Sequence, residues 1–118
     1  MANQLPAELN ICRVRGDTFP FSVTISQAGT AVDITGYTII MTVDPSSEPT
    51  DALANLFENT GVITDGPNGI VTFTLSLADS SQTPGEYFHD MQLTDGSGFV
   101  RTFANGTYEV LQDIGGKP

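Results

Sequence analysis

Few residues of this 118-residue chain could do nucleophilic or acid–base chemistry. It has one histidine, His89, and one cysteine, Cys12. Strand alternation places His89 on the same face as Tyr87 and Met91, with Asp90 on the opposite face. A catalytic nucleophile needs a neighbouring base that a third group orients, and no such motif surrounds His89. We therefore expect His89 to be a packed or surface residue, and we expect no catalytic residue and no enzyme activity.

Metal chemistry is also poorly provided for. One histidine and one cysteine cannot build a zinc site. Calcium prefers acidic loops, but Asp65 and Asp95 are each followed by glycine in a turn-like segment, and no loop of alternating aspartates exists. We expect no metal and no cofactor. A pair of carboxylates for glycoside hydrolysis stays open as a weaker alternative, although most acids stand in turns or beside glycine and proline.

Two short motifs have familiar readings. Residues 15–17 (RGD) spell a cell-adhesion tripeptide, and residues 105–107 (NGT) fit the N-glycosylation pattern. Glycine at a bend and aspartate in an Asx turn explain the first equally well. We expect both segments to be structural, with Asn105 and Gly106 marking a bulge or turn.

The charge balance excludes several partners. The chain has 14 acidic and 4 basic residues, a net charge of −10, and 39% hydrophobic residues. Nucleic acids and anionic membranes require clustered lysine and arginine, so neither is expected as a partner. The first residues lack the basic and apolar regions of a secretion signal, and a single cysteine cannot form an intrachain disulfide. We expect a soluble protein made in a cytoplasm.

The elements that must position these residues are short strands. Alternating or β-branched runs separated by turn residues predict strands at 10–15, 19–26, 37–43, 62–65, 70–77, 87–94, 99–103 and 107–111, with a short extended piece at 32–34. The only expected helix lies near residues 50–58, where Leu53, Leu56 and Phe57 have helical spacing; a loop is the alternative. Residues 78–84 are expected to form a connecting turn.

This pattern predicts an all-β fold, an antiparallel immunoglobulin-like β-sandwich of about seven or eight strands. One domain spans 1–118, with an N-terminal arm at 1–9, an inserted loop or short helix at 45–59 and a flexible tail at 114–118. Alternation predicts a core that contains Phe21, Val23, Ile39, Met41, Phe73, Leu75, Tyr87 and Leu93.

Tyr87 opens a strand after Pro84 and Gly85, where an immunoglobulin-like chain crosses between its sheets. A tyrosine at such a corner bonds its hydroxyl to the upstream backbone. Tyr87 is therefore a candidate corner tyrosine; the alternative is a strand residue with a solvated hydroxyl.

Several segments together resemble a family of bacteriophage virion proteins. They are residues 15–21 (RGDTFPF), 32–37 (VDITGY), 64–71 (TDGPNGIV), 83–87 (TPGEY) and 92–96 (QLTDG). Their order over residues 15–113 is similar to that of the N-terminal β-sandwich domain of phage baseplate upper proteins and related tail or head-fibre attachment proteins. The family supplies no catalytic residues.

The resemblance implies a structural component of a phage particle, at the tail or baseplate, that contacts other phage structural proteins. A head decoration or head-fibre protein is the first alternative, and a carbohydrate-binding module is the second. Virion sites have rotational symmetry, so a homo-oligomer is expected. Apolar residues outside the sandwich pattern are candidate oligomer or partner contacts, unless they fold back on their own subunit: Leu5, Leu9, Leu53, Leu56 and Phe57.

Overall fold

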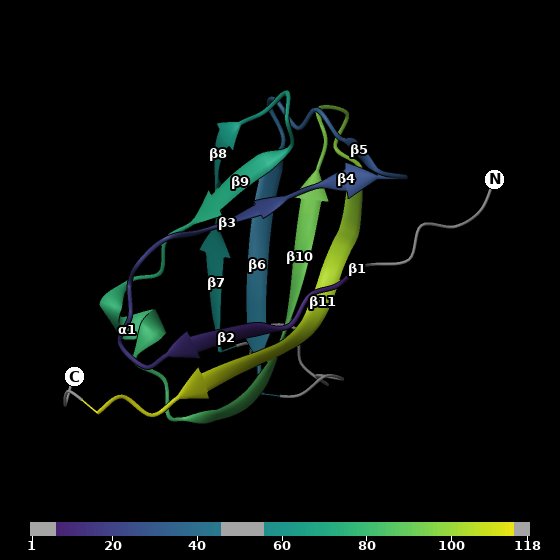
Figure 1. Cartoon of the computed structure of the whole chain (residues 1–118). Helices are drawn as coiled ribbons and strands as arrows, with labels where there is room; N and C mark the ends of the chain where they lie inside the picture. Colours follow the sequence, from purple (N-terminus) through teal and green to yellow (C-terminus); the bar gives the residue numbers. More distant parts are fainter. Residues whose placement is uncertain (1–6, 46–55, 115–118) are drawn as a thin grey trace.

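The computed structural model describes residues 7–45 and 56–114, and most of them belong to two stacked β-sheets (Figure 1). The larger sheet has the strand order β1-β11-β10-β6-β7, with β2 also paired to β11. Its strands are β1 (Ala7–Glu8), β2 (Ile11–Val14), β6 (Thr38–Asp44), β7 (Phe57–Thr60), β10 (Gly85–Thr94) and β11 (Val100–Leu111).

The smaller sheet has the order β3-β9-β8 and consists of β3 (Phe21–Thr24), β9 (Ile70–Phe73) and β8 (Val62–Asp65). A two-residue hairpin, β4 (Ser26–Gln27) with β5 (Thr30–Ala31), continues from β3. One short helix, α1 (Leu77–Ser80), connects the two sheets between β9 and β10.

The predicted β-sandwich is confirmed, and eight of the described strands have four or more residues. One correction concerns direction. β1 and β2 both run parallel to β11, whereas the other pairs are antiparallel. Both short N-terminal strands therefore sit on the same edge of the larger sheet.

The core lies between the two sheets. Alternate residues of β6 and β9 point inward and are buried, among them Ile39, Met41, Val71 and Phe73. Of the eight predicted core residues, Ile39, Met41, Phe73, Leu75 and Leu93 are buried. The other three, Phe21, Val23 and Tyr87, are half-buried and pack against the same cluster.

The helix expected near 50–58 does not extend through its last residues, because Phe57 and Glu58 belong to β7. The main chain there pairs with β6: the Leu56 N–H donates to the Val43 carbonyl at 2.8 Å. Phe57 faces Val43 in this pairing. As a strand beside β6, this segment buries Phe57 in the core. A helix of barely two turns is only marginally stable by itself. Residues 50–55 lie outside the described part of the chain.

The helix occurs instead at 77–80, where a connecting turn was expected. Ser76 caps it, since the Ser76 hydroxyl accepts a hydrogen bond from the Asp79 N–H at 3.0 Å. Asp79 also places a negative charge in the first turn, which favours a helix N-terminus.

The strands expected at 99–103 and 107–111 are one continuous strand, β11. Its bulge is at Phe103, since Met91 pairs with Ala104 and Gln92 pairs with Thr102. Asn105 and Gly106, where the bulge was expected, are regularly paired.

Two turns distant in the sequence contact each other. The Ile34 N–H donates to the Gly66 carbonyl at 2.9 Å, and Ile34 is fully buried. The Gly66 backbone lies against Thr35 so closely that a side chain at position 66 would meet the Thr35 main chain at 3.1 Å. The 32–37 and 64–71 segments are thus parts of one packed unit.

Candidate functional site

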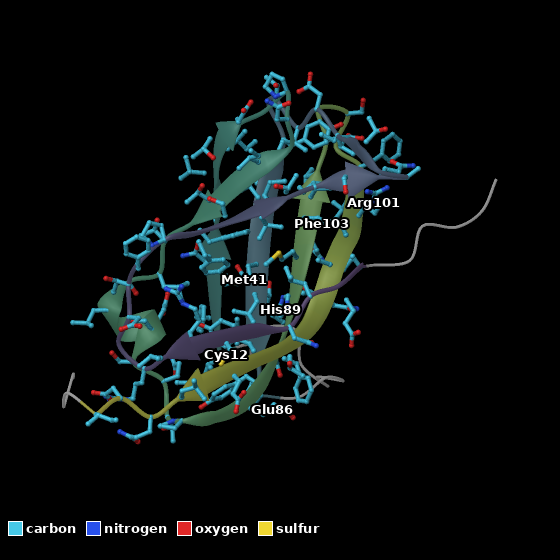
Figure 2. All side chains as sticks on the ribbon, in the orientation of Figure 1. Cys12, Met41, Glu86, His89, Arg101 and Phe103 are labelled. Atoms are coloured by element: carbon cyan, nitrogen blue, oxygen red, sulfur yellow. The ribbon has the colours of Figure 1, made fainter. Side chains whose placement is uncertain are left out.

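His89 is a buried residue of β10 whose ring serves the fold. It is 4% exposed and shares the inner face with buried Met91, as strand alternation predicted. Its Nε2 lies 2.5 Å from the Leu9 carbonyl oxygen. A carbonyl only accepts, so Nε2 carries the proton and donates. Nδ1 is buried and has no partner among the described residues. The ring therefore holds the segment between β1 and β2 (Figure 2).

The environment of His89 favours the neutral ring. Burial lowers the pKa of His89 below its ordinary value, and the Leu9 carbonyl and nearby Asp90 oppose this only in part. Burial likewise raises the pKa of the neighbouring Asp90 carboxyl, and His89 opposes that shift. Asp90 sits on the other face of β10 and does not orient the imidazole.

The carboxylates of Asp33 and Asp95 accept hydrogen bonds from residues of their own turns. Asp33 accepts hydrogen bonds from the Thr35 N–H at 3.0 Å and the Thr35 hydroxyl at 2.6 Å, which lowers the pKa of Asp33. Asp95 Oδ1 accepts from the N–H groups of Ser97 and Phe99. Asp95 has the turn role that the sequence suggested, whereas Asp33 begins a turn in a segment, 32–34, that was expected to be extended. Within 7–45 and 56–114, no group of three or more metal-ligating side chains comes together.

The Arg15-Gly16-Asp17 segment is a structural junction. Gly16 is buried with φ of +85°, a conformation that favours glycine, and its N–H donates to the Ser80 carbonyl at 2.9 Å. The Arg15 guanidinium lies 3.6 Å from the buried Asp113 carboxylate. An adhesion motif would present these side chains to solvent; here Arg15 is turned toward its own chain.

Three of the candidate partner contacts lie against the chain's own core. Phe57 is only 6% exposed and stacks edge-to-face on Tyr108, with ring centroids 5.9 Å apart. Leu9 and Leu56 are half-buried on the same cluster. The alternative, folding back on the same subunit, describes these three residues. The other two candidates, Leu5 and Leu53, lie outside the described residues.

Tyr87 has the hydrogen bond expected of a corner tyrosine. Its hydroxyl donates to the Thr83 carbonyl at 2.6 Å, four residues upstream. The chain between Phe73 and Gly85 passes from the smaller to the larger sheet through α1. The bond therefore ties the end of the crossing to the start of β10.

A groove of about 270 Å³ opens between the two sheets at the β1–β11 edge. β1 and β11 form one wall, and β3 with the β4 turn forms the other. Arg101 and Phe103, both on β11, line it and are labelled in Figure 2. Glu8 also lines the groove.

Arg101 is the groove residue that sequence reasoning missed. It pairs with the buried Leu93, so its side chain leaves β11 on the inner face of the larger sheet. Its guanidinium makes no ion pair or hydrogen bond with any residue that the structure describes. Strand alternation alone does not place it there, because the bulge at Phe103 moves the inner face from Arg101 to Ala104.

Comparison with known proteins gives little beyond the fold. No protein-family model matches the chain, and no curated protein matches it. Among solved structures it is similar to CopC from Methylosinus trichosporium OB3b, with 9% identity over 91% of this chain and 84% of that chain, and a TM-score of 0.49. A likeness at this level says nothing about function.

Within the described residues, no helix is both long and apolar enough to cross a membrane.

Proposed function

We propose that this chain is a structural component of a bacteriophage particle, located at the tail or baseplate and acting through contacts with other virion proteins. The support comes from the ordered segments that resemble phage attachment domains. The observation that carries the proposal is the contact between two of them, in which Ile34 bonds to Gly66 and Gly66 packs on Thr35. Segments that pack together in this way belong to one structural unit. Unrelated turn motifs that resemble the family by chance would not be expected to contact each other.

The surface offers apolar side chains for such contacts. Near the end where β2 and β11 finish, Phe19, Leu77, Leu111 and Ile114 are exposed. The Arg15 N–H bonds to the Leu111 carbonyl, and the Gly16 N–H bonds to the Ser80 carbonyl, so these segments adjoin one another. Exposed apolar side chains gathered at one end suit a docking surface on a partner protein.

The same proposal includes several copies of the chain on a symmetric attachment site. Leu9, Leu56 and Phe57 pack on the chain's own core. The surface that would contact other copies is therefore the end that exposes Phe19, Leu77, Leu111 and Ile114. The net charge of −10 opposes association, and salt screens that repulsion. Light scattering behind a sizing column should therefore show larger species at about 500 mM than at about 20 mM salt. A monomer at both salts would remove the homo-oligomer from the proposal.

The test of the virion role is to locate the protein in particles. Antibodies raised against the purified chain are applied to density-purified phage particles from an infected or induced host culture, and bound antibody is seen by immunogold electron microscopy. Label at the baseplate or along the tail is expected. Label on the capsid would favour the head-decoration alternative. Absence from particles while the protein is abundant in the cell would overturn a virion role.

The carbohydrate-binding alternative has weaker support. Such a module would use tryptophan or tyrosine rings as an exposed platform. The chain has no tryptophan, and Tyr108 is 1% exposed, with burial raising its pKa to about 12. Tyr37 and Tyr87 are half-buried against the core.

A further inference from the structure

Two kinds of groups at the groove beside Arg101 are available to bind a partner. The first is the charged guanidinium of Arg101. Arg101 is one of only four basic residues in a chain with 14 acidic ones, yet its guanidinium has no ionic partner among the described residues. Its side chain leaves the strand on the face that carries Leu93 and the core, and it remains half-exposed at the groove. An arginine in this setting forms strong paired hydrogen bonds with a carboxylate.

The second is the main chain along one edge of β3. β3 forms one wall of the groove and, among the described residues, pairs only with β9. Within 7–45 and 56–114, the main-chain N–H and C=O groups on its other edge have no strand partner. An exposed strand edge of this kind accepts an additional strand from another chain, with main-chain hydrogen bonds supplying affinity.

The remaining lining sets the character of the occupant. Phe103, Val23 and Ile25 supply apolar surface, and Thr24, Thr102 and Ser26 supply hydroxyl groups. Glu8 faces Asn105 in the β1–β11 pairing, whereas Arg101 lies further toward the start of β11. A carboxylate on the occupant is therefore favoured at the Arg101 end and disfavoured near Glu8.

We propose that this groove binds an extended acidic segment of a partner protein, which adds as a strand to the free edge of β3 and places one carboxylate on Arg101. The occupant is a peptide strand with alternating small apolar side chains and an aspartate or glutamate. The inference goes beyond a virion role, since it names the binding surface and the chemistry of the segment, and its test requires only the purified chain.

A competing explanation is that Arg101 only protects the edge. Charged side chains that point inward at a sheet edge discourage unwanted strand pairing between copies. The two explanations differ in what Arg101→Gln does. Edge protection predicts self-association of this variant with no effect on peptide binding, whereas a docking site predicts a loss of selectivity for an acidic peptide.

The experiment follows the backbone amides of the ¹⁵N-labelled chain by NMR during titration with a capped Thr-Val-Asp-Val-Thr peptide, up to about 5 mM. Saturable shifts are expected at Phe21–Thr24 and along β11 from residue 101 to 104. The amides of Val62–Asp65, on the opposite edge of the same sheet, serve as the internal control and should not shift. The matching peptide with asparagine in place of aspartate should bind about tenfold more weakly.

Arg101→Gln should bring the two peptides to the same affinity. Arg15→Gln makes the same change in net charge at an arginine already paired with Asp113, and it should keep the tenfold difference. Equal affinity of both peptides for the unaltered chain would overturn the proposal, and this comparison needs no variant to fold. Unsaturated shifts scattered over the surface, or self-association of Arg101→Gln with unchanged peptide selectivity, would also overturn it.

Discussion

The His89 ring reaches the Leu9 carbonyl oxygen across the strand that separates them. His89 is on β10 and pairs with Gly106 of β11, and the Leu9 segment lies on the far side of β11. The Leu9 carbonyl carbon would lie 2.8 Å from a side chain at position 106, so only glycine leaves the space that the contact needs. A histidine, a glycine and a main-chain carbonyl thus act together to hold the N-terminal edge of the larger sheet.

Gly106→Ala should destabilise the protein by about 1–3 kcal/mol, since the new methyl group would meet the Leu9 main chain and Asn10. Gly96→Ala is the matched control, because a methyl group there meets nothing within 4 Å. Urea denaturation followed by circular dichroism measures both. Equal stability of the two variants would mean that the Leu9 segment is not held against β11.

The stability of the chain should fall as the pH drops below about 6.5, the ordinary pKa of histidine. The pKa of His89 is lowered in the folded state, so the unfolded state binds the proton first and gains from acid. His89→Gln should flatten the pH dependence in this window while costing stability at pH 8.

Asp90 should change the stability in the opposite direction. Its pKa is raised above 3.8 in the folded state, so stability falls as the pH rises above that value. Urea midpoints of His89→Gln and Asp90→Asn, measured between about pH 3.5 and 8, separate the two groups.

Phe73→Ala should cost about 3–5 kcal/mol, the usual loss when a large aromatic side chain is removed from a core. Phe73 is 0% exposed and stacks on Phe21 with ring centroids 5.6 Å apart. Phe19→Ala removes the same atoms from a side chain that is 79% exposed, and its stability should change by less than about 0.5 kcal/mol. Similar urea midpoints for the two variants would contradict the register of β9.

Tyr87→Phe should reduce stability by about 0.5–1.5 kcal/mol, because it removes only the hydroxyl that bonds to Thr83. Tyr37→Phe is a suitable control, since the Tyr37 hydroxyl makes no hydrogen bond within the described residues. Thermal denaturation of both variants gives the comparison. A neutral Tyr87→Phe would show that the corner is held by packing alone.

Strand alternation predicted much of the fold. The β6 and β9 patterns placed Ile39, Met41 and Phe73 in the core because an inner face must alternate with an outer one. The turn at Asp95 was also predicted, since the Asp95 carboxylate accepts hydrogen bonds from the backbone of its own turn. These features are local in sequence, and a single chain displays them.

Most of the errors lie where a distant partner decided the structure. Phe57 had helical spacing with its neighbours, but pairing with Val43 on β6 made it a strand residue. The exception is α1, where the signal is local, since Ser76 and Asp79 have the spacing of a helix cap. Arg101 became visible as a candidate site residue only when the register placed it opposite Leu93.

β11 also determines when the N-terminal strands can pair during synthesis. Thr107 bonds to Asn10 across 97 positions of sequence, and both N-terminal strands pair with this late strand. As the ribosome delivers the chain, β1 and β2 have no strand to join until β11 has been made. Contacts of such long separation slow folding and leave strand edges exposed in the meantime. The nascent chain must therefore keep its N-terminal strands unpaired for most of its translation, and the larger sheet reaches its full width only after β11 leaves the ribosome.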